Sequence, residues 1–205
     1  MTSTDPRPAR TRQRLFDALY QLAGTHDLTE LSISEIARTA GVDRGSFYTQ
    51  FADKQTFLDA VCAELFVDFD EMLENLRDES WYRDEIDIAT IPSIYPIVAR
   101  RAALYRQLLA GAGPTAFRSM LHRRMCEAFI ELAELHGVAT PHALPPLPIR
   151  AEFASAGLLA LVSRWLADER EDEIDQYTFW AWEMLTLLGQ RSPTFRPLGT
   201  GSART

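Results

Sequence analysis

The sequence has few of the residues that hold secreted domains or metal centres together. Its two cysteines, Cys62 and Cys126, form no CxxC pair, and its four histidines show no metal-ligand spacing. Both cysteines lie in helical patterns, so we expect buried, reduced thiols in a reducing cytosol, with no metal and no cofactor. No stretch is apolar over the ~18 residues that a membrane span needs, and the N-terminus has no apolar signal core. These absences predict a soluble, cytoplasmic protein that does not act at a membrane.

Catalytic signatures are also missing. There is no nucleophile elbow, P-loop or GxGxxG, and no carboxylate–histidine cluster is evident. We therefore expect no enzymatic activity.

An excess of positive charge, which is typical of proteins that bind any nucleic acid, is absent as well. The formal net charge is −8. Its distribution is uneven, because the segment up to Lys54 carries six arginines and is close to neutral, while acidic runs lie at 68–74 and 168–175. This pattern favours one local DNA-facing surface on an acidic body.

The chain has no period-two alternation long enough for a strand, and apolar residues recur at helical spacing almost throughout. We predict an all-α protein in which an N-terminal three-helix DNA-binding domain is joined by a long helix to a C-terminal bundle that dimerises. The expected parts are a flexible basic arm at 1–10, a helix-turn-helix domain at 11–55, a ligand-binding and dimerisation domain at 56–191 and a disordered tail at 192–205. The helices are expected from Thr11 to about Gly24, over 53–77, 97–110, 114–137, 149–170 and 173–190, with breaks marked by Pro92 and Pro96 and two short helices within 32–51.

The most informative segment is 31–54. Ser32 and Glu35 form a capping box at the start of a short helix, and Gly41 stands where a left-handed residue ends it. Asp43 can cap a second short helix, 44–50. The inward-facing residues are expected to be Ile36, Ala37, Ala40, Val42, Phe47 and Phe51.

Two short helices joined by a tight glycine turn are typical of the helix-turn-helix, whose second helix enters the major groove. Arg44 can fork onto guanine or hold a phosphate, while Gly45 permits close approach of the backbone. The phenol of Tyr48 and the charge of Lys54, in the first turn of the next helix, suit phosphate contacts. The predicted DNA-binding set is Ser34, Arg44, Gly45, Ser46, Tyr48, Thr49 and Lys54.

The segment resembles the DNA-binding domain of the TetR family of regulators over about residues 11–60. The resemblance is carried by Ser32, Ile36-Ala37, Ala40-Gly41-Val42, Ser46-Phe47-Tyr48, Phe51 and Lys54. Asp43 departs from the Ser or Thr that family members often have, so the cap survives with a negative charge on the DNA side. The resemblance implies double-stranded DNA as a partner and dimerisation through two C-terminal helices.

The last two helices are apolar on more than one side, which also favours a partner chain. The first is expected to bury Phe153, Leu158, Leu159, Leu161, Val162, Trp165 and Leu166. The second carries one stripe of Tyr177, Trp180, Ala181, Met184, Leu185 and Leu188 and another of Phe179, Trp182 and Leu187.

Aromatic and methionine side chains in the bundle can line a cavity for a small apolar or amphipathic effector, although each can equally be plain core. The candidates are Tyr95, Tyr105, Phe117, Met120, His122, Met125, Phe129 and Trp165.

These observations predict a DNA-binding transcriptional regulator, a ligand-responsive repressor that binds a palindromic operator as a homodimer. An activator or a regulator without an effector stays open. So does a different class, a ligand-binding or enzymatic helical bundle that has lost DNA binding.

Overall fold

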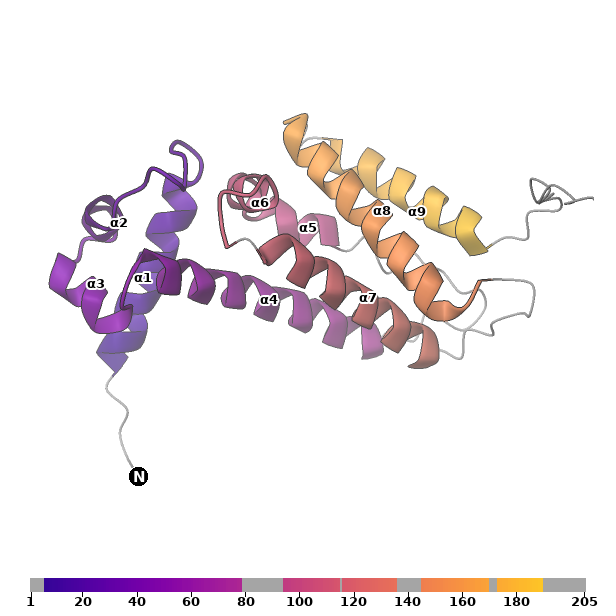
Figure 1. Cartoon of the computed structure of the whole chain (residues 1–205), viewed down its shortest axis with the longest axis horizontal. Helices are drawn as coiled ribbons and strands as arrows, with labels where there is room; N and C mark the ends of the chain where they lie inside the picture. The colour runs from indigo at the N-terminus through magenta and orange to yellow at the C-terminus, as the bar shows by residue number, and fades with distance from the viewer. Residues whose placement is uncertain (1–5, 79–93, 115, 136–144, 170–172, 190–205) are drawn as a thin grey trace, which may run out of the picture.

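The computed structural model describes residues 6–78, 94–114, 116–135, 145–169 and 173–189, and within these ranges every regular element is a helix (Figure 1). The all-α prediction is therefore confirmed for the described residues. The helices are α1 (Pro6–Leu22), α2 (Ile33–Thr39), α3 (Arg44–Gln50), α4 (Lys54–Asp78), α5 (Ile94–Ala99), α6 (Ala102–Leu109), α7 (Phe117–Leu135), α8 (Leu147–Ala167) and α9 (Ile174–Gly189).

Helices α1, α2 and α3 gather at one end of the molecule around an aromatic core (Figure 1). The core consists of Phe16 of α1, Phe47 of α3, Phe51 at the end of α3 and Phe57 of α4, and the ring centroids of neighbouring pairs lie 5.1 to 6.1 Å apart. The four rings are almost fully buried, so they fix α3 against α1 and α4.

Helix α1 begins at Pro6, five residues before the expected start at Thr11. Arg7 and Arg10, which we expected on a flexible arm, therefore lie on the exposed side of a helix. Proline is well tolerated at such a start because the first N–H groups of a helix have no partner within it.

Helix α4 is the predicted long connection. Its first turns belong to the aromatic core through Phe57, while Phe69 and Leu73 further along are buried against the bundle. In Figure 1 it runs from the N-terminal domain along the length of α7.

The single helix expected over 97–110 is wrong, because the structure has two helices here, with the break at Arg100 and Arg101. Arg101 leaves helical geometry (φ −137°, ψ 39°), forms an ion pair with Asp68 of α4, and stacks its guanidinium over Tyr20. Pro96 marks no break, since it lies in the first turn of α5, where the N–H that it lacks is not needed. Pro92 and the tail at 192–205 lie outside the described residues.

Helices α8 and α9 pack side by side (Figure 1). Each carries apolar side chains both in the core and on the exposed surface. Contrary to expectation, Phe153 is 66% exposed, and Ile149 one turn before it is 60% exposed. On α9, Tyr177 and Ala181 face the core, whereas the outward side carries Phe179, Trp180 and Met184. The side chains of Trp182, Leu185, Leu187 and Leu188 lie outside the described residues. Across the ranges that the structure describes, no helix is long and apolar enough to cross a membrane.

Candidate DNA-binding surface and helical bundle

The start of α2 is held by the predicted capping box. Ser32 Oγ accepts from the backbone N–H of Glu35 at 3.2 Å, and the Glu35 carboxylate accepts from the backbone N–H of Ser32 at 2.9 Å. The two hydrogen bonds from Ser32 hold the pKa of Glu35 below its ordinary value. The cap is therefore formed with Glu35 ionised at neutral pH.

The turn between α2 and α3 depends on Gly41. Its φ of +63° lies in the left-handed region, as predicted. Arg14 of α1 donates from Nη2 to the Gly41 carbonyl oxygen at 2.8 Å, so the turn is also tied to α1.

Asp43 caps α3, as the sequence predicts. Its Oδ1 accepts from the backbone N–H of Ser46 at 2.8 Å and its Oδ2 from the Ser46 hydroxyl at 2.8 Å. These hydrogen bonds lower the pKa of Asp43. A Cβ added at Gly45 would lie 3.0 Å from Asp43 Oδ1, so the glycine leaves room for the cap as well as for an approaching backbone.

The outer face of α3 carries the predicted polar set. Arg44, Gly45, Tyr48 and Thr49 are exposed, Ser46 is half-buried, and Phe47 between them is fully buried. Arg44 Nη2 donates to the Tyr48 hydroxyl at 3.1 Å, and the guanidinium lies 5.5 Å from the ring centroid. Ser34 is exposed on α2. The fold thus brings the α3 residues to one solvent-facing side.

Lys54 is held more tightly than the sequence indicates. Its Nζ donates to the Thr29 carbonyl oxygen at 3.0 Å in the α1–α2 loop, and the side chain is half-buried. Burial lowers the pKa of Lys54, although the charges of Asp27 and Glu35 oppose that shift. An ammonium has three donor hydrogens, so two stay available for another acceptor.

Helix α6 joins the N-terminal domain to the bundle through neighbouring residues. Gln107 accepts from the Leu28 backbone N–H at 2.7 Å and donates to the carbonyl oxygens of Ala23 and His26 at 2.7 and 2.8 Å. Next to it, Arg106 Nε donates to the Leu166 carbonyl oxygen near the end of α8 at 2.7 Å. No local sequence pattern indicates a role for either side chain, because their partners are about 60 to 80 residues away.

A small, partly open apolar cavity of about 30 Å³ lies between the bundle helices, which is room for roughly one water molecule. Of the predicted effector-binding candidates, Phe129 and Met125 line it. Tyr95 and Trp165 are instead fully buried and stacked edge to face on each other, and Met120 is 41% exposed. Tyr105 and Phe117 are buried core residues with rings 6.2 Å apart, and His122 is not among the residues that line the cavity. The other lining residues, Phe69, Met72, Leu73, Ile94, Ala128, Leu132, Ser155 and Leu158, were not among the candidates.

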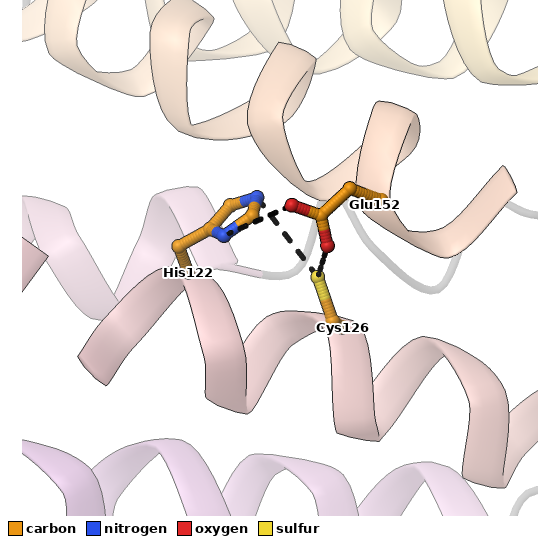
Figure 2. Close-up of side chains that lie close together, drawn as sticks. All are labelled: His122, Cys126 and Glu152. Carbon is orange, nitrogen blue, oxygen red and sulfur yellow. Dashed lines mark hydrogen bonds and ion pairs between the residues drawn. The ribbon is translucent and has the colours of Figure 1, made fainter. Parts of the chain in front are cut away.

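One cluster of chemically active side chains was missed altogether. Figure 2 shows His122 and Cys126 of α7 and Glu152 of α8 pointing toward one another. Cys126 is half-buried rather than buried, unlike Cys62, which is only 5% exposed. The i, i+4 spacing of His122 and Cys126 indicates that both side chains lie on one face of a helix. The spacing of the four histidines alone does not reveal this pair.

A capped helix, a left-handed glycine turn and a second capped helix with an exposed polar face define a helix-turn-helix protein, here with a helical C-terminal domain. Residues 15–61 match the family of bacterial regulatory proteins called the tetR family. The N-terminal segment is therefore similar to the DNA-binding domain of tetR-family regulators.

A relative from Haemophilus influenzae, described as an uncharacterized HTH-type transcriptional regulator, is 29% identical over 134 residues. The match covers 61% of this chain and 62% of the relative, which is less than two thirds of its length.

Two solved structures share the fold over nearly their whole length. The fatty acid degradation regulator FadR from Bacillus halodurans superposes with a TM-score of 0.69 at 15% identity, covering 88% of this chain and 99% of that one. FadR from Bacillus subtilis, in complex with stearoyl-CoA, gives 0.65 at 14% identity, covering 84% and 96%. At these identities the likeness is one of fold.

Proposed function

We propose that this chain is a TetR-family transcriptional regulator, a ligand-responsive repressor that binds a palindromic operator as a homodimer. The observation that carries the DNA-binding part is the exposed polar face of α3, which is held rigidly by a capped start and a buried aromatic underside. A helix presented in this way enters the major groove with its N-terminal side chains nearest the bases.

The contacts are divided by chemistry. Arg44 is the base reader, because its guanidinium can fork onto guanine, and the hydroxyl of Tyr48 holds it in place from one turn away. Ser34, Tyr48, Thr49 and Lys54 contact phosphates, with Gly45 and Ser46 at the closest approach of the backbone. Among the residues proposed to contact phosphates, Lys54 is the charged one. It must contact a phosphate while keeping its hydrogen bond to the Thr29 carbonyl oxygen.

Selection of bound duplexes from a random DNA pool, followed by anisotropy titrations over a salt series, tests this surface. Arg44→Ala should lower affinity for the selected duplex at least tenfold and relax its sequence preference. Lys54→Ala should weaken binding to all duplexes and flatten the salt dependence by about two units per dimer. Arg118→Ala, an exposed arginine on α7, is the control for loss of charge. Unchanged DNA affinity in both Arg44→Ala and Lys54→Ala would show that the DNA-binding surface lies elsewhere.

The homodimer is supported by the exposed apolar surface of α8 and α9. Ile149 and Phe153 are followed on α8 by exposed Ala156, Gly157 and Ala160, and Trp180 is exposed on α9, which packs beside α8. Among the residues that the structure describes, no neighbouring atom lies within 4 Å of a Cβ added at Gly157, so there is room here for close approach by a second copy. A contiguous apolar face of this kind marks an interaction site.

Sedimentation at micromolar concentration tests the dimer. The wild type should sediment as a dimer, whereas Phe153→Asp and Gly157→Gln should yield monomer. Val67→Asp, at an apolar residue that is 49% exposed on α4, is the matched control and should leave the dimer intact. A monomeric wild type would refute this part of the proposal.

The effector is proposed to be an amphipathic molecule with a long apolar chain, such as an acyl thioester. Two features support this class: the apolar cavity bounded by α4, α5, α7 and α8, and the fold likeness to a regulator solved with stearoyl-CoA. A cavity of about 30 Å³ cannot hold such a chain, so binding must select a conformation in which the lining helices have separated. That requirement couples the ligand to a change of shape.

Titrating the operator complex with long-chain acyl-CoA tests the effector. Release of DNA is expected with the acyl thioester and not with free CoA. Ala128→Phe, which fills the cavity, should abolish release while leaving DNA binding intact, and Ala63→Phe on the exposed side of α4 should behave as wild type. Tighter DNA binding with the thioester would identify an activator, and a folded protein that binds no selected duplex would identify a bundle that has lost DNA binding.

A further inference from the structure

His122, Cys126 and Glu152 converge from two packed helices. His122 and Cys126 lie one turn apart on the same face of α7, and Glu152 lies opposite them near the start of α8 (Figure 2). The Cys126 Sγ is 3.9 Å from His122 Nε2 and 3.5 Å from Glu152 Oε2, and His122 Nδ1 is 3.9 Å from Glu152 Oε1. One ligand atom from each side chain lies within 4.8 Å of the other two.

The two distances to Cys126 Sγ are close to those that a tetrahedral ion imposes. With Zn–S near 2.3 Å and Zn–N or Zn–O near 2.0–2.2 Å, the ligand atoms of a tetrahedral site lie about 3.3–3.6 Å apart. Small side-chain rotations, without movement of either helix, therefore suffice to close the three atoms around one ion. Ligands on rigid helices hold such geometry better than ligands on loops.

Charge and access also fit a divalent transition metal. A thiolate and a carboxylate neutralise a 2+ ion, and sulfur, imidazole and carboxylate together suit zinc rather than calcium or magnesium. The two arginines of α7 nearest the cluster are engaged with other carboxylates, because Arg124 pairs with Asp70 and Glu127, and Arg123 lies beside Glu127. The His122 side chain is 24% exposed and that of Glu152 is 68% exposed, so an ion can enter from solvent.

We propose that His122, Cys126 and Glu152 form a three-ligand site for a divalent transition metal of the zinc class, which joins α7 to α8 and leaves a fourth position for water or a small anion. The site shares its helices with the cavity, because Met125 and Ala128 flank Cys126 and Ser155 lies one turn beyond Glu152. A bound ion would fix the spacing of α7 and α8 and thus stabilise the packed bundle. This site is independent of the DNA surface.

Metal binding is tested with the full-length reduced protein. Co²⁺ is used for its visible spectrum, in which thiolate ligation gives a charge-transfer band, and Zn²⁺ is used to displace it. The variants are His122→Gln, Cys126→Ser and Glu152→Gln, and the control is His26→Gln, an exposed histidine on the α1–α2 loop. A second measurement needs no variant: the rate at which a maleimide labels Cys126 in the wild type, with and without Zn²⁺.

We expect one tightly bound ion per chain, a thiolate–cobalt band lost in Cys126→Ser, and at least tenfold weaker binding in each ligand variant. Zn²⁺ should raise the thermal midpoint of the wild type and of His26→Gln only, and should slow the labelling of Cys126 at least tenfold. Equal affinity in wild type and Cys126→Ser, or unprotected labelling of Cys126 at saturating Zn²⁺, would overturn the site and leave the three side chains as a hydrogen-bonded contact between helices.

Discussion

Replacement of Gly41 by alanine probes the turn that positions the recognition helix. At a φ of +63°, an L side chain costs about 1–2 kcal/mol relative to glycine. The new Cβ would also lie 2.7 Å from Arg14 Nη2, so the hydrogen bond from Arg14 to the turn must lengthen or break, at a cost of roughly 0.5–1.5 kcal/mol. We expect Gly41→Ala to destabilise the N-terminal domain by about 2–3 kcal/mol.

Gly24→Ala is the matched control. Gly24 has no left-handed φ. A Cβ added there would lie 3.6 Å from the Gln21 carbonyl oxygen, which is an ordinary van der Waals distance. The substitution removes freedom mainly from the unfolded chain, so we expect a change between zero and about 1 kcal/mol of stabilisation.

Urea unfolding followed by two signals locates the effect. All four tryptophans lie at or beyond residue 81, so tryptophan fluorescence reports on the C-terminal part, whereas far-ultraviolet circular dichroism reports on all helices. Gly41→Ala should lower the urea concentration at the midpoint of the circular dichroism transition and leave the midpoint of the fluorescence transition almost unchanged. Equal midpoints for Gly41→Ala and Gly24→Ala would show that the turn is not the strained element that its backbone indicates.

Three further outcomes are expected. Burial raises the pKa of the Cys62 thiol to about 12, so at pH 8 iodoacetamide should leave Cys62 unmodified until the protein is unfolded, and mass spectrometry of peptides checks this. The hydrogen bonds that Asp43 accepts from Ser46 lower the pKa of the Asp43 carboxyl group. The stabilisation from this cap is therefore present above the ordinary carboxyl pKa and is lost as the pH falls through the pKa of Asp43 in the folded protein. Thermal midpoints of Asp43→Asn should therefore fall less steeply than those of wild type below about pH 4. Gln107→Ala should speed hydrogen exchange at the Leu28 amide, with Gln21→Ala on α1 as the unaffected control.

The DNA-binding half was predictable because its decisive interactions are local. The Ser32–Glu35 and Asp43–Ser46 caps span three residues each, and the left-handed Gly41 is recognisable from its place after the helix. Such contacts are encoded in short windows of sequence, so the boundaries of α2 and α3 are matched closely.

The bundle was less predictable because its geometry rests on contacts between distant residues. The α5–α6 break is stabilised by Arg101 with Asp68, which are 33 positions apart, and no helical periodicity reports that pair. The exposure of Phe153 shows the converse limit. Hydropathy marks it as an interior residue, but it cannot say whether the interior belongs to one chain or to two.

Helix α6 contacts both the N-terminal domain and the bundle, so it can couple a change in one to a change in the other. The free energies of its hydrogen bonds are large enough for such coupling. Gln107 makes three hydrogen bonds to the α1–α2 loop, each contributing about 0.5–1.5 kcal/mol, and Arg106 beside it holds the end of α8. Allosteric coupling typically amounts to about 1–3 kcal/mol, so making or losing this one set of contacts suffices. The effector proposed above, in parting α7 from α8, need not deform α3. It need only shift the end of α8 far enough for Arg106 to follow, because Gln107, the next residue on the same helix turn, must then move relative to the loop that Lys54 also holds.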